Sequence, residues 1–167
     1  KMPYGQGLRA DQIERGVEES LKRLQTDVID LYQAHIDDAS APLEETLRAF
    51  DALIRSGKVR AIGASNYTAA RLRESLDIST EHGLARYECL QPRYNAIDRT
   101  FEEEICPLCR AESVGVIPYV ALAGGFLTGK YRREGPMPET ARAAGVQRNY
   151  FNDKGFAVLA QIEAAAQ

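Results

Sequence analysis

Four short apolar segments begin at nearly equal intervals along the chain, and this spacing constrains the fold more than any other feature of the sequence. The segments are VIDLYQAH (28–35), VRAIGAS (59–65), YECLQPRY (87–94) and VGVIPY (114–119). Their apolar and β-branched side chains predict buried strands. The segments begin about 30 residues apart, which is the length of one strand-and-helix unit. The spacing therefore predicts parallel strands joined by right-handed helical crossovers.

Amphipathic segments occupy the intervals around these strands. Apolar side chains recur at helical spacing in residues 10–24, 43–57, 68–83, 100–112 and 152–167. Pro42 is suited to open the second of these helices, and Gly57 and Gly83 are suited to end the second and the third. Pro107 is a weak point of the fourth helix, because proline has no backbone N–H to donate.

Two architectures share this alternation, an open doubly wound sheet and a closed (β/α)8 barrel. An open dinucleotide-binding sheet carries Gly-x-Gly-x-x-Gly directly after a strand. Neither Gly124-Gly125 nor any other glycine group has that spacing. A complete barrel takes eight units and about 250 residues. We therefore predict an α/β chain that represents about half of a TIM barrel, with residues 1–167 as a single domain.

Charge and hydropathy narrow the range of partners. The composition, 44% hydrophobic and 27% charged, is typical of a soluble globular domain. Basic residues alternate with acidic ones and the formal net charge is -3, so no basic stripe suits nucleic acid. No apolar run approaches the roughly 20 residues that cross a bilayer, and the first residues lack the apolar core of a signal peptide. We expect a cytoplasmic protein without nucleic-acid or membrane partners.

Two of the three cysteines form the motif Cys106-Pro107-Leu108-Cys109. Such a pair is compatible with redox chemistry or with half of a zinc site. A structural zinc, however, takes four ligands, and no second Cys or His pair lies at a suitable spacing. We therefore predict free thiols and no metal site.

Polar or aromatic side chains stand where each predicted strand ends. They are His35, Ser65 with Asn66, Gln91 with Tyr94, and Tyr119, which precedes a glycine-rich turn. In a (β/α)8 barrel, active sites are built at the carboxyl ends of the strands. The sequence therefore predicts that these side chains share one binding site.

Each of these residues also has a purely structural interpretation. His35 is compatible with a core histidine, and Asn66 with an N-cap of the helix that follows it. Gln91 precedes Pro92 and suits a simple strand terminus, while Tyr119 suits packing at the rim. Because four successive strands end in the same way, we favour the common site.

Long stretches of the sequence resemble the aldo-keto reductases, especially the bacterial branch that includes aryl-alcohol-dehydrogenase-like members. The resemblance runs from about Leu8 to the end and is carried by LKRLQTDVIDLYQAHIDD, EETLRAFDALIRSGKVRAIGASNY, LQPRYNAIDR and GVIPYVALAGGFLTGKY. It implies a TIM barrel and NADPH-dependent reduction of aldehydes and ketones to alcohols. The implied partner is a small carbonyl compound.

The resemblance also assigns roles to residues of this chain. His35 matches the active-site histidine, and Tyr119 matches the ring that stacks on the nicotinamide. The groups that bind the nicotinamide carboxamide match Ser65, Asn66 and Gln91. The loop whose backbone approaches the pyrophosphate matches Leu122, Ala123, Gly124 and Gly125.

Three features depart from the family pattern. The resemblance places the catalytic aspartate and tyrosine upstream of Lys1, and Lys1 itself stands near the position of the catalytic lysine. Val120 replaces a serine hydroxyl, so we expect cofactor binding to weaken by about 0.5 to 1.5 kcal/mol, the value of one hydrogen bond. The Gly- and Pro-containing segment 131–148 is compatible with a flap over the site or with a plain connector.

An alternative function follows from the small number of predicted strands. A half barrel that is catalytically incompetent would expose two strand edges and part of its apolar interior. Such a chain is expected to self-associate as a homo-oligomer or to bind a nucleotide without turnover.

Overall fold

The computed structural model describes residues 1–2 and 7–166, which fold into two compact units. The first unit comprises Lys1–Pro92 and Glu104–Ile117, and the second comprises Arg93–Glu103 and Pro118–Gln167. The prediction that residues 1–167 form a single domain stays a prediction.

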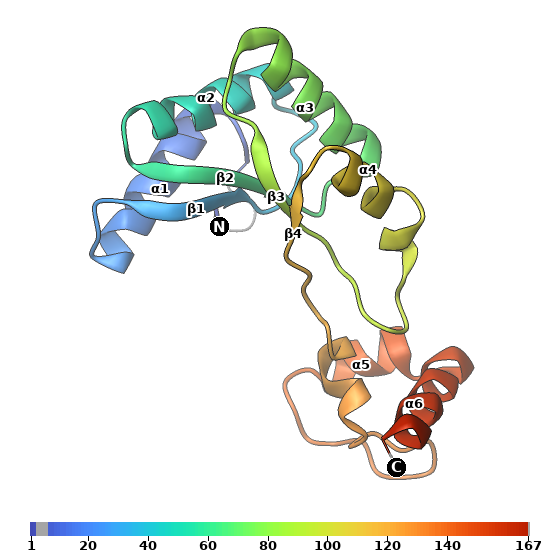
Figure 1. Cartoon of the computed structure of the whole chain (residues 1–167). Helices are drawn as coiled ribbons and strands as arrows, with labels where there is room; N and C mark the ends of the chain where they lie inside the picture. The colour runs from blue at the N-terminus through green and yellow to red at the C-terminus, as the bar shows by residue number, and fades with distance from the viewer. Residues whose placement is uncertain (3–6, 167) are drawn as a thin grey trace. The chain divides into compact units, whose positions relative to one another are not determined.

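The first unit is a parallel sheet whose strands follow chain order (Figure 1). The strands are β1 (Ile29–Ala34), β2 (Val59–Ser65), β3 (Tyr87–Gln91) and β4 (Gly115–Val116). Its helices are α1 (Ala10–Leu24), α2 (Leu43–Arg55), α3 (Ala69–His82) and α4 (Ile105–Ala111). All pairings are parallel, as the strand-and-helix repeat predicted.

Register divides the side chains of the sheet between two faces. Aligned on one face are Ala34, Ala64, Leu90 and Val116, and aligned on the other are Gln33, Gly63, Cys89 and Gly115. The first face is the one that α2 covers, because Tyr32, two residues before Ala34, contacts the ring of Phe50 at 6.1 Å. The second face therefore points away from α2.

Local sequence explains where the main helices begin and end. The Thr68 side chain accepts a hydrogen bond from Arg71 N at 3.2 Å and caps α3, which ends at Gly83 in the left-handed conformation. The cap is thus Thr68, and the interpretation of Asn66 as the cap is wrong. Tyr67 is buried, and its hydroxyl contacts that of Tyr87 at 3.3 Å. Burial raises the pKa of Tyr67 to about 12, so this phenol stays protonated as part of the core.

Two predicted elements are shorter than their sequence patterns. The helix expected over 100–112 is broken into the 3-10 turn η1 (Thr100–Glu102) and α4, with Pro107 in the first turn of α4. Proline is tolerated there because the first N–H groups of a helix have no partner inside the helix. The strand expected over 114–119 is reduced to β4, which ends at Val116.

The second unit contains η2 (Ala123–Thr128), α5 (Ala143–Tyr150) and α6 (Asp153–Ala165). Its core contains a cluster of aromatic rings around Phe126, whose ring centroid lies 6.0 Å from that of Tyr131, 6.3 Å from that of Tyr150 and 5.2 Å from that of Phe156. The segment 131–148, treated as a loop in the sequence, includes most of α5. Val146 of that helix is buried in the aromatic core.

The three cysteines are free thiols, as predicted. Burial raises the pKa of Cys89 and of Cys109. In the part of the chain that the structure describes, no three His, Cys, Asp or Glu side chains gather where they could hold a metal ion. None of the helices in residues 1–2 and 7–166 has the length and apolar character that a membrane span requires.

Candidate functional site

The predicted site residues of the first unit gather at the carboxyl ends of β1, β2 and β3. Ser65 is paired with Gln91 in the register of the sheet. Both lie two residues beyond Gly63 and Cys89, so their side chains point to the face away from α2. His35 immediately follows β1 and lies two residues beyond Gln33 of the same face. Strand register therefore brings the ends of these three strands together at one edge of the sheet.

The hydroxyl of Ser65 is the centre of a hydrogen-bond cluster. Its Oγ donates to Gln91 O at 2.8 Å and accepts from Lys1 Nζ at 2.8 Å and from Asn66 Nδ2 at 3.1 Å. A hydroxyl has one proton to donate and two lone pairs, so these three bonds use its whole capacity. Ser65 is 0% exposed, and its role in the structure is to link three segments.

Asn66 joins the ends of β1 and β3 to that of β2. Its φ of 60° lies in the left-handed region, which Asn tolerates better than most residues. Its Nδ2 donates to His35 O at 3.0 Å, and its backbone N donates to Gln91 O at 3.3 Å. Both strand ends next to β2 are thus held by one residue.

The contacts of the His35 ring indicate which nitrogen carries its proton. Nδ1 lies 3.3 Å from Met2 O, and a carbonyl oxygen only accepts, so we assign the proton to Nδ1. Met2 N donates in turn to Gln33 O at 2.9 Å, which aligns residues 1–2 beside β1. Lys1 thereby reaches the same rim, where burial lowers the pKa of its ammonium group.

The remaining predicted site residues belong to the second unit, where backbone hydrogen bonds and left-handed backbone angles define their arrangement. Tyr119 is bridged to Arg93, and Tyr119 O accepts from Tyr94 N at 3.3 Å. Left-handed φ values follow at Val120 (61°), Ala123 (50°), Gly124 (68°) and Gly125 (100°). In a residue with a Cβ this conformation costs about 1–2 kcal/mol, and such strain concentrates at ligand-binding turns. Turns of this kind can point successive N–H groups at an anion.

Comparison with known proteins places this geometry in a family. The sequence profile described as "Aldo/keto reductase family" matches residues 1–166. The chain belongs to the aldo/keto reductase family.

Individual relatives agree with this assignment. The chain is 36% identical to human "Aldo-keto reductase family 7 member A3" over 172 aligned residues, covering 98% of this chain and 52% of the relative. It is 42% identical to "Aldo-keto reductase YhdN" of Bacillus subtilis (strain 168) over 123 residues, covering 74% of this chain and 35% of the relative. This aldo/keto reductase chain therefore spans about half the length, or less, of the curated relatives it matches.

A solved structure extends the similarity to the fold. It is described as the glycerol dehydrogenase AKR11B4 from Gluconobacter oxydans and matches with a TM-score of 0.77 at 34% identity. The match covers 93% of this chain and 46% of that structure. The prediction of a parallel α/β fold that represents about half of a TIM barrel is thus confirmed.

The roles that the family resemblance implies for individual residues stay predictions. The structure brings His35, Ser65, Asn66 and Gln91 of this aldo/keto reductase together at one rim of the first unit. In the second unit, Tyr119 precedes the turn of residues 120–125, in which Gly124 and Gly125 are left-handed and Leu122 is 59% exposed. Sequence reasoning missed the hydrogen bond of Lys1 to Ser65 and the ion pair of Arg71 with Asp37, which lies two residues after His35. Bonds between residues far apart in the sequence leave no local pattern.

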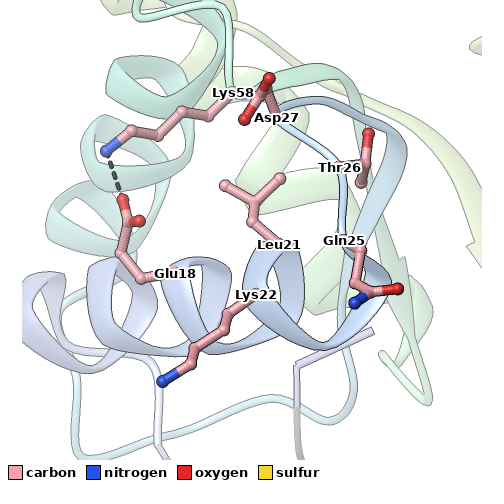
Figure 2. Close-up of a pocket in the computed structure, with 7 residues that line it drawn as sticks. All are labelled: Glu18, Leu21, Lys22, Gln25, Thr26, Asp27 and Lys58. Carbon is pink, nitrogen blue, oxygen red and sulfur yellow. Dashed lines mark hydrogen bonds and ion pairs between the residues drawn. The ribbon is translucent and has the colours of Figure 1, made fainter.

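A hollow of about 520 Å³ lies at the opposite end of β1 and β2 (Figure 2). Its lining residues are Glu18, Leu21, Lys22, Gln25, Thr26, Asp27 and Lys58. Figure 2 shows Lys58, which precedes β2, ion-paired with Glu18 across one side of this hollow. In (β/α)8 enzymes this end of the strands serves stability, so the hollow is separate from the candidate site of this aldo/keto reductase.

Proposed function

We propose that the chain forms the nicotinamide-binding part of an NADPH-dependent reductase that converts aldehydes and ketones to alcohols. The observation that supports this most is the hydrogen-bonded rim of His35, Ser65, Asn66 and Gln91 in a chain of the aldo/keto reductase family. A cytoplasmic location, a small carbonyl substrate and the absence of nucleic-acid and membrane partners remain part of this proposal.

The residues of the chain fit the cofactor. A nicotinamide carboxamide has both donor and acceptor atoms, and the side-chain amides of Asn66 and Gln91 supply both kinds of group at one rim. In the second unit, the left-handed turn that contains Gly124 and Gly125 suits an approach of backbone N–H groups to phosphate. Tyr119 supplies the ring for stacking. When bound, NADPH would supply the hydride.

The chain's own residues would then stabilise the negative charge that develops on the carbonyl oxygen. Negative charge on this oxygen in the transition state is stabilised by positioned donors. His35 would orient the oxygen through Nε2, since Nδ1 is directed at Met2 O. Because Nδ1 carries the proton, His35 donates at Nε2 only as an imidazolium. Lys1, at the same rim, is suited to lower the pKa of the tyrosine that gives the proton in this family.

Replacing His35 and Asn66 separately tests whether His35 acts on the carbonyl oxygen and Asn66 on the cofactor. We expect His35→Ala to lower kcat for aromatic aldehydes by about 10²–10³-fold, as for the loss of one positioned donor to the developing oxyanion, with little change in the Kd of NADPH. Asn66→Ala should mainly raise that Kd, with a smaller fall in kcat because Asn66 Nδ2 also donates to His35 O. The measurements are steady-state kinetics and a cofactor-fluorescence titration, with NADH run in parallel to test the preference for NADPH.

The matched control is His82→Ala, which removes the only other histidine of the chain. His82 ends α3 and faces Glu44 at 3.7 Å, so its loss should leave both constants near those of the wild type. Equal effects of His35→Ala on kcat and Kd would contradict the proposed role of His35. A wild-type protein that binds NADPH and reduces no carbonyl compound would replace the proposal with nucleotide binding without turnover.

A further inference from the structure

The segment that carries His35 contains no buried apolar side chain. It runs from His35 to Ser40, between the buried Ala34 and Ala41. Ile36, its one large apolar side chain, is 42% exposed. Because no apolar side chain is buried within the segment, its position depends on the polar contacts it makes.

Besides the 3.3 Å contact of His35 Nδ1 with Met2 O, these polar contacts come from the side of α1 and from the side of β2 and α3. On the side of α1, Asp38 Oδ2 accepts from Leu8 N at 3.0 Å and Ser40 O accepts from Arg9 Nη2 at 2.9 Å. Both of those bonds hold the far end of the segment. The end near His35 is held from the other side, where Asn66 Nδ2 donates to His35 O at 3.0 Å.

A second bond from that side falls two residues after His35. Arg71 Nε, in the first turn of α3, donates to Asp37 Oδ1 at 3.0 Å, while Arg71 Nη1 contacts Glu74 Oε2 at 2.9 Å. Arg71 lies five residues after Asn66 along the chain. The strand end of β2 and the start of α3 thus hold the His35 segment at two points, one through a backbone carbonyl and one through a carboxylate.

Among the ion pairs of the described residues, the one between Arg71 and Asp37 includes the arginine that is most shielded from solvent. The side chains of Arg71 and Asp37 are 20% and 27% exposed, whereas Arg93, the next least exposed arginine among the ion pairs of the described residues, is 37% exposed. Exposed pairs contribute little, while removing one partner of a shielded pair leaves an uncompensated charge. Loss of Arg71 should therefore release Asp37 and the segment with it.

We propose that Arg71 is a positioning residue for His35, acting through its ion pair with Asp37. The inference rests on the proposed reductase function for its kinetic consequence and on geometry alone for the placement of the ring. Arg71 would not touch substrate or cofactor. It would hold the imidazole where Nε2 meets the carbonyl oxygen, and a small misplacement of such a group is costly in rate.

The test compares Arg71→Met with Arg73→Met in the purified protein. Arg73 lies on the same helix and pairs with Glu112 of the first unit at 2.5 Å, so its loss removes an ion pair that includes no residue of the His35 segment. We expect Arg71→Met to lower kcat by about 10- to 100-fold while the Kd of NADPH changes by less than about threefold. Arg73→Met should leave both constants near wild type.

Two further variants separate positioning from general loss of structure. Arg71→Lys keeps a cation for Asp37 and should retain more activity than Arg71→Met. Asp37→Asn should lower kcat as Arg71→Met does, and the double variant should be no worse than either single one, because both remove the same bond. Additive losses, or a loss in Arg71→Met no larger than in Arg73→Met, would overturn the proposal. Should Arg71→Met fail to show a cooperative melt, Arg71→Lys and Asp37→Asn carry the test.

A readout independent of activity covers the case in which the wild type shows no turnover. The chain has two histidines, so His35 and His82 can be assigned and followed by NMR of the imidazole ring. We expect Arg71→Met to shift or broaden the His35 signals while those of His82 remain, and Arg73→Met to leave His35 unchanged. An inactive wild type would contradict the proposed reductase function but not the positioning role of Arg71. Unchanged His35 signals in Arg71→Met would end the positioning role of Arg71.

Discussion

The two units of the molecule arrange their predicted site residues in different ways. In the first unit, His35, Ser65 and Gln91 follow strands, and the register of a parallel sheet sets the direction of their side chains. In the second unit, Tyr119 leads into a turn whose backbone is left-handed at Val120, Ala123, Gly124 and Gly125. The first unit thus presents side chains from regular structure, whereas the second presents backbone groups from strained structure.

The hydrophobic cores of the two units also differ in the residues that build them. Aliphatic residues of helices and strands make up most of the first core, with the rings of Tyr32, Phe50 and Tyr87 in contact at its centre. The second core is small, and within it the rings of Tyr131, Tyr150 and Phe156 surround that of Phe126. A regular sheet distributes its stability over many contacts, while a cluster of rings concentrates it in a few.

The largest effect is expected for Phe126→Ala in the second core. Removing a buried phenylalanine costs about 3–5 kcal/mol, and here it takes three ring contacts with it. We expect hydrogen exchange to quicken in α5 and α6 while β1, β2 and β3 keep their protection. Phe50→Ala is the matched control and should affect the first unit in the same way. Loss of protection in both units with either variant would instead show that they unfold together, as a single domain would.

A smaller effect is expected for Gly63→Ala in the sheet. A Cβ at Gly63 would lie 2.6 Å from Cys89 Sγ and 2.9 Å from Cys89 O, so β2 and β3 approach too closely for a side chain. Overpacking of this kind typically costs about 1–3 kcal/mol. Gly115, on the same face of the sheet, is the control, because its Cβ would come no nearer than 3.4 Å to Glu88 O. Urea denaturation should show a lower midpoint for Gly63→Ala than for Gly115→Ala, and the opposite order would contradict this packing.

The smallest effect concerns Asp38, which anchors the segment after β1. The hydrogen bond from the Ser40 hydroxyl, followed by that from Leu8 N, lowers the pKa of Asp38 below its ordinary 3.8. A carboxyl with a lowered folded pKa stabilises the fold above its ordinary pKa and loses this contribution as pH falls through the lowered value. We expect Asp38→Ala to cost about 1 kcal/mol at neutral pH, since the group is largely solvated.

The measurement for Asp38→Ala is urea unfolding at neutral pH and at a pH below 3.8. The difference in unfolding free energy between variant and wild type should shrink on acidification, because protonation removes the same bonds from the wild type. A difference that stays constant between the two pH values would mean that the carboxylate charge plays no part in anchoring the segment.

The regular part of the fold could be predicted because its signals are local and periodic. The helices α1, α2 and α3 and the strand β2 lie within two residues of their expected bounds, since apolar spacing, Pro42, Gly57 and Gly83 mark them directly. The break at η1 and the helix α5 were missed. After η1, a second helix begins at Ile105 with Pro107 in its first turn, where a single helix was expected, and α5 depends on burying Val146 among distant aromatic rings.

The sequence by itself determined the alternation of strands and helices, the family, and the strand ends at which His35, Ser65, Asn66 and Gln91 stand. Tertiary structure alone decided how those ends are joined: by the saturated hydroxyl of Ser65, the contact of His35 Nδ1 with Met2 O, and the pairing of Arg71 with Asp37. The physical reason is that periodicity records which face of an element is buried. A hydrogen bond between residues more than 30 positions apart depends instead on the register of strands and the direction of individual side chains.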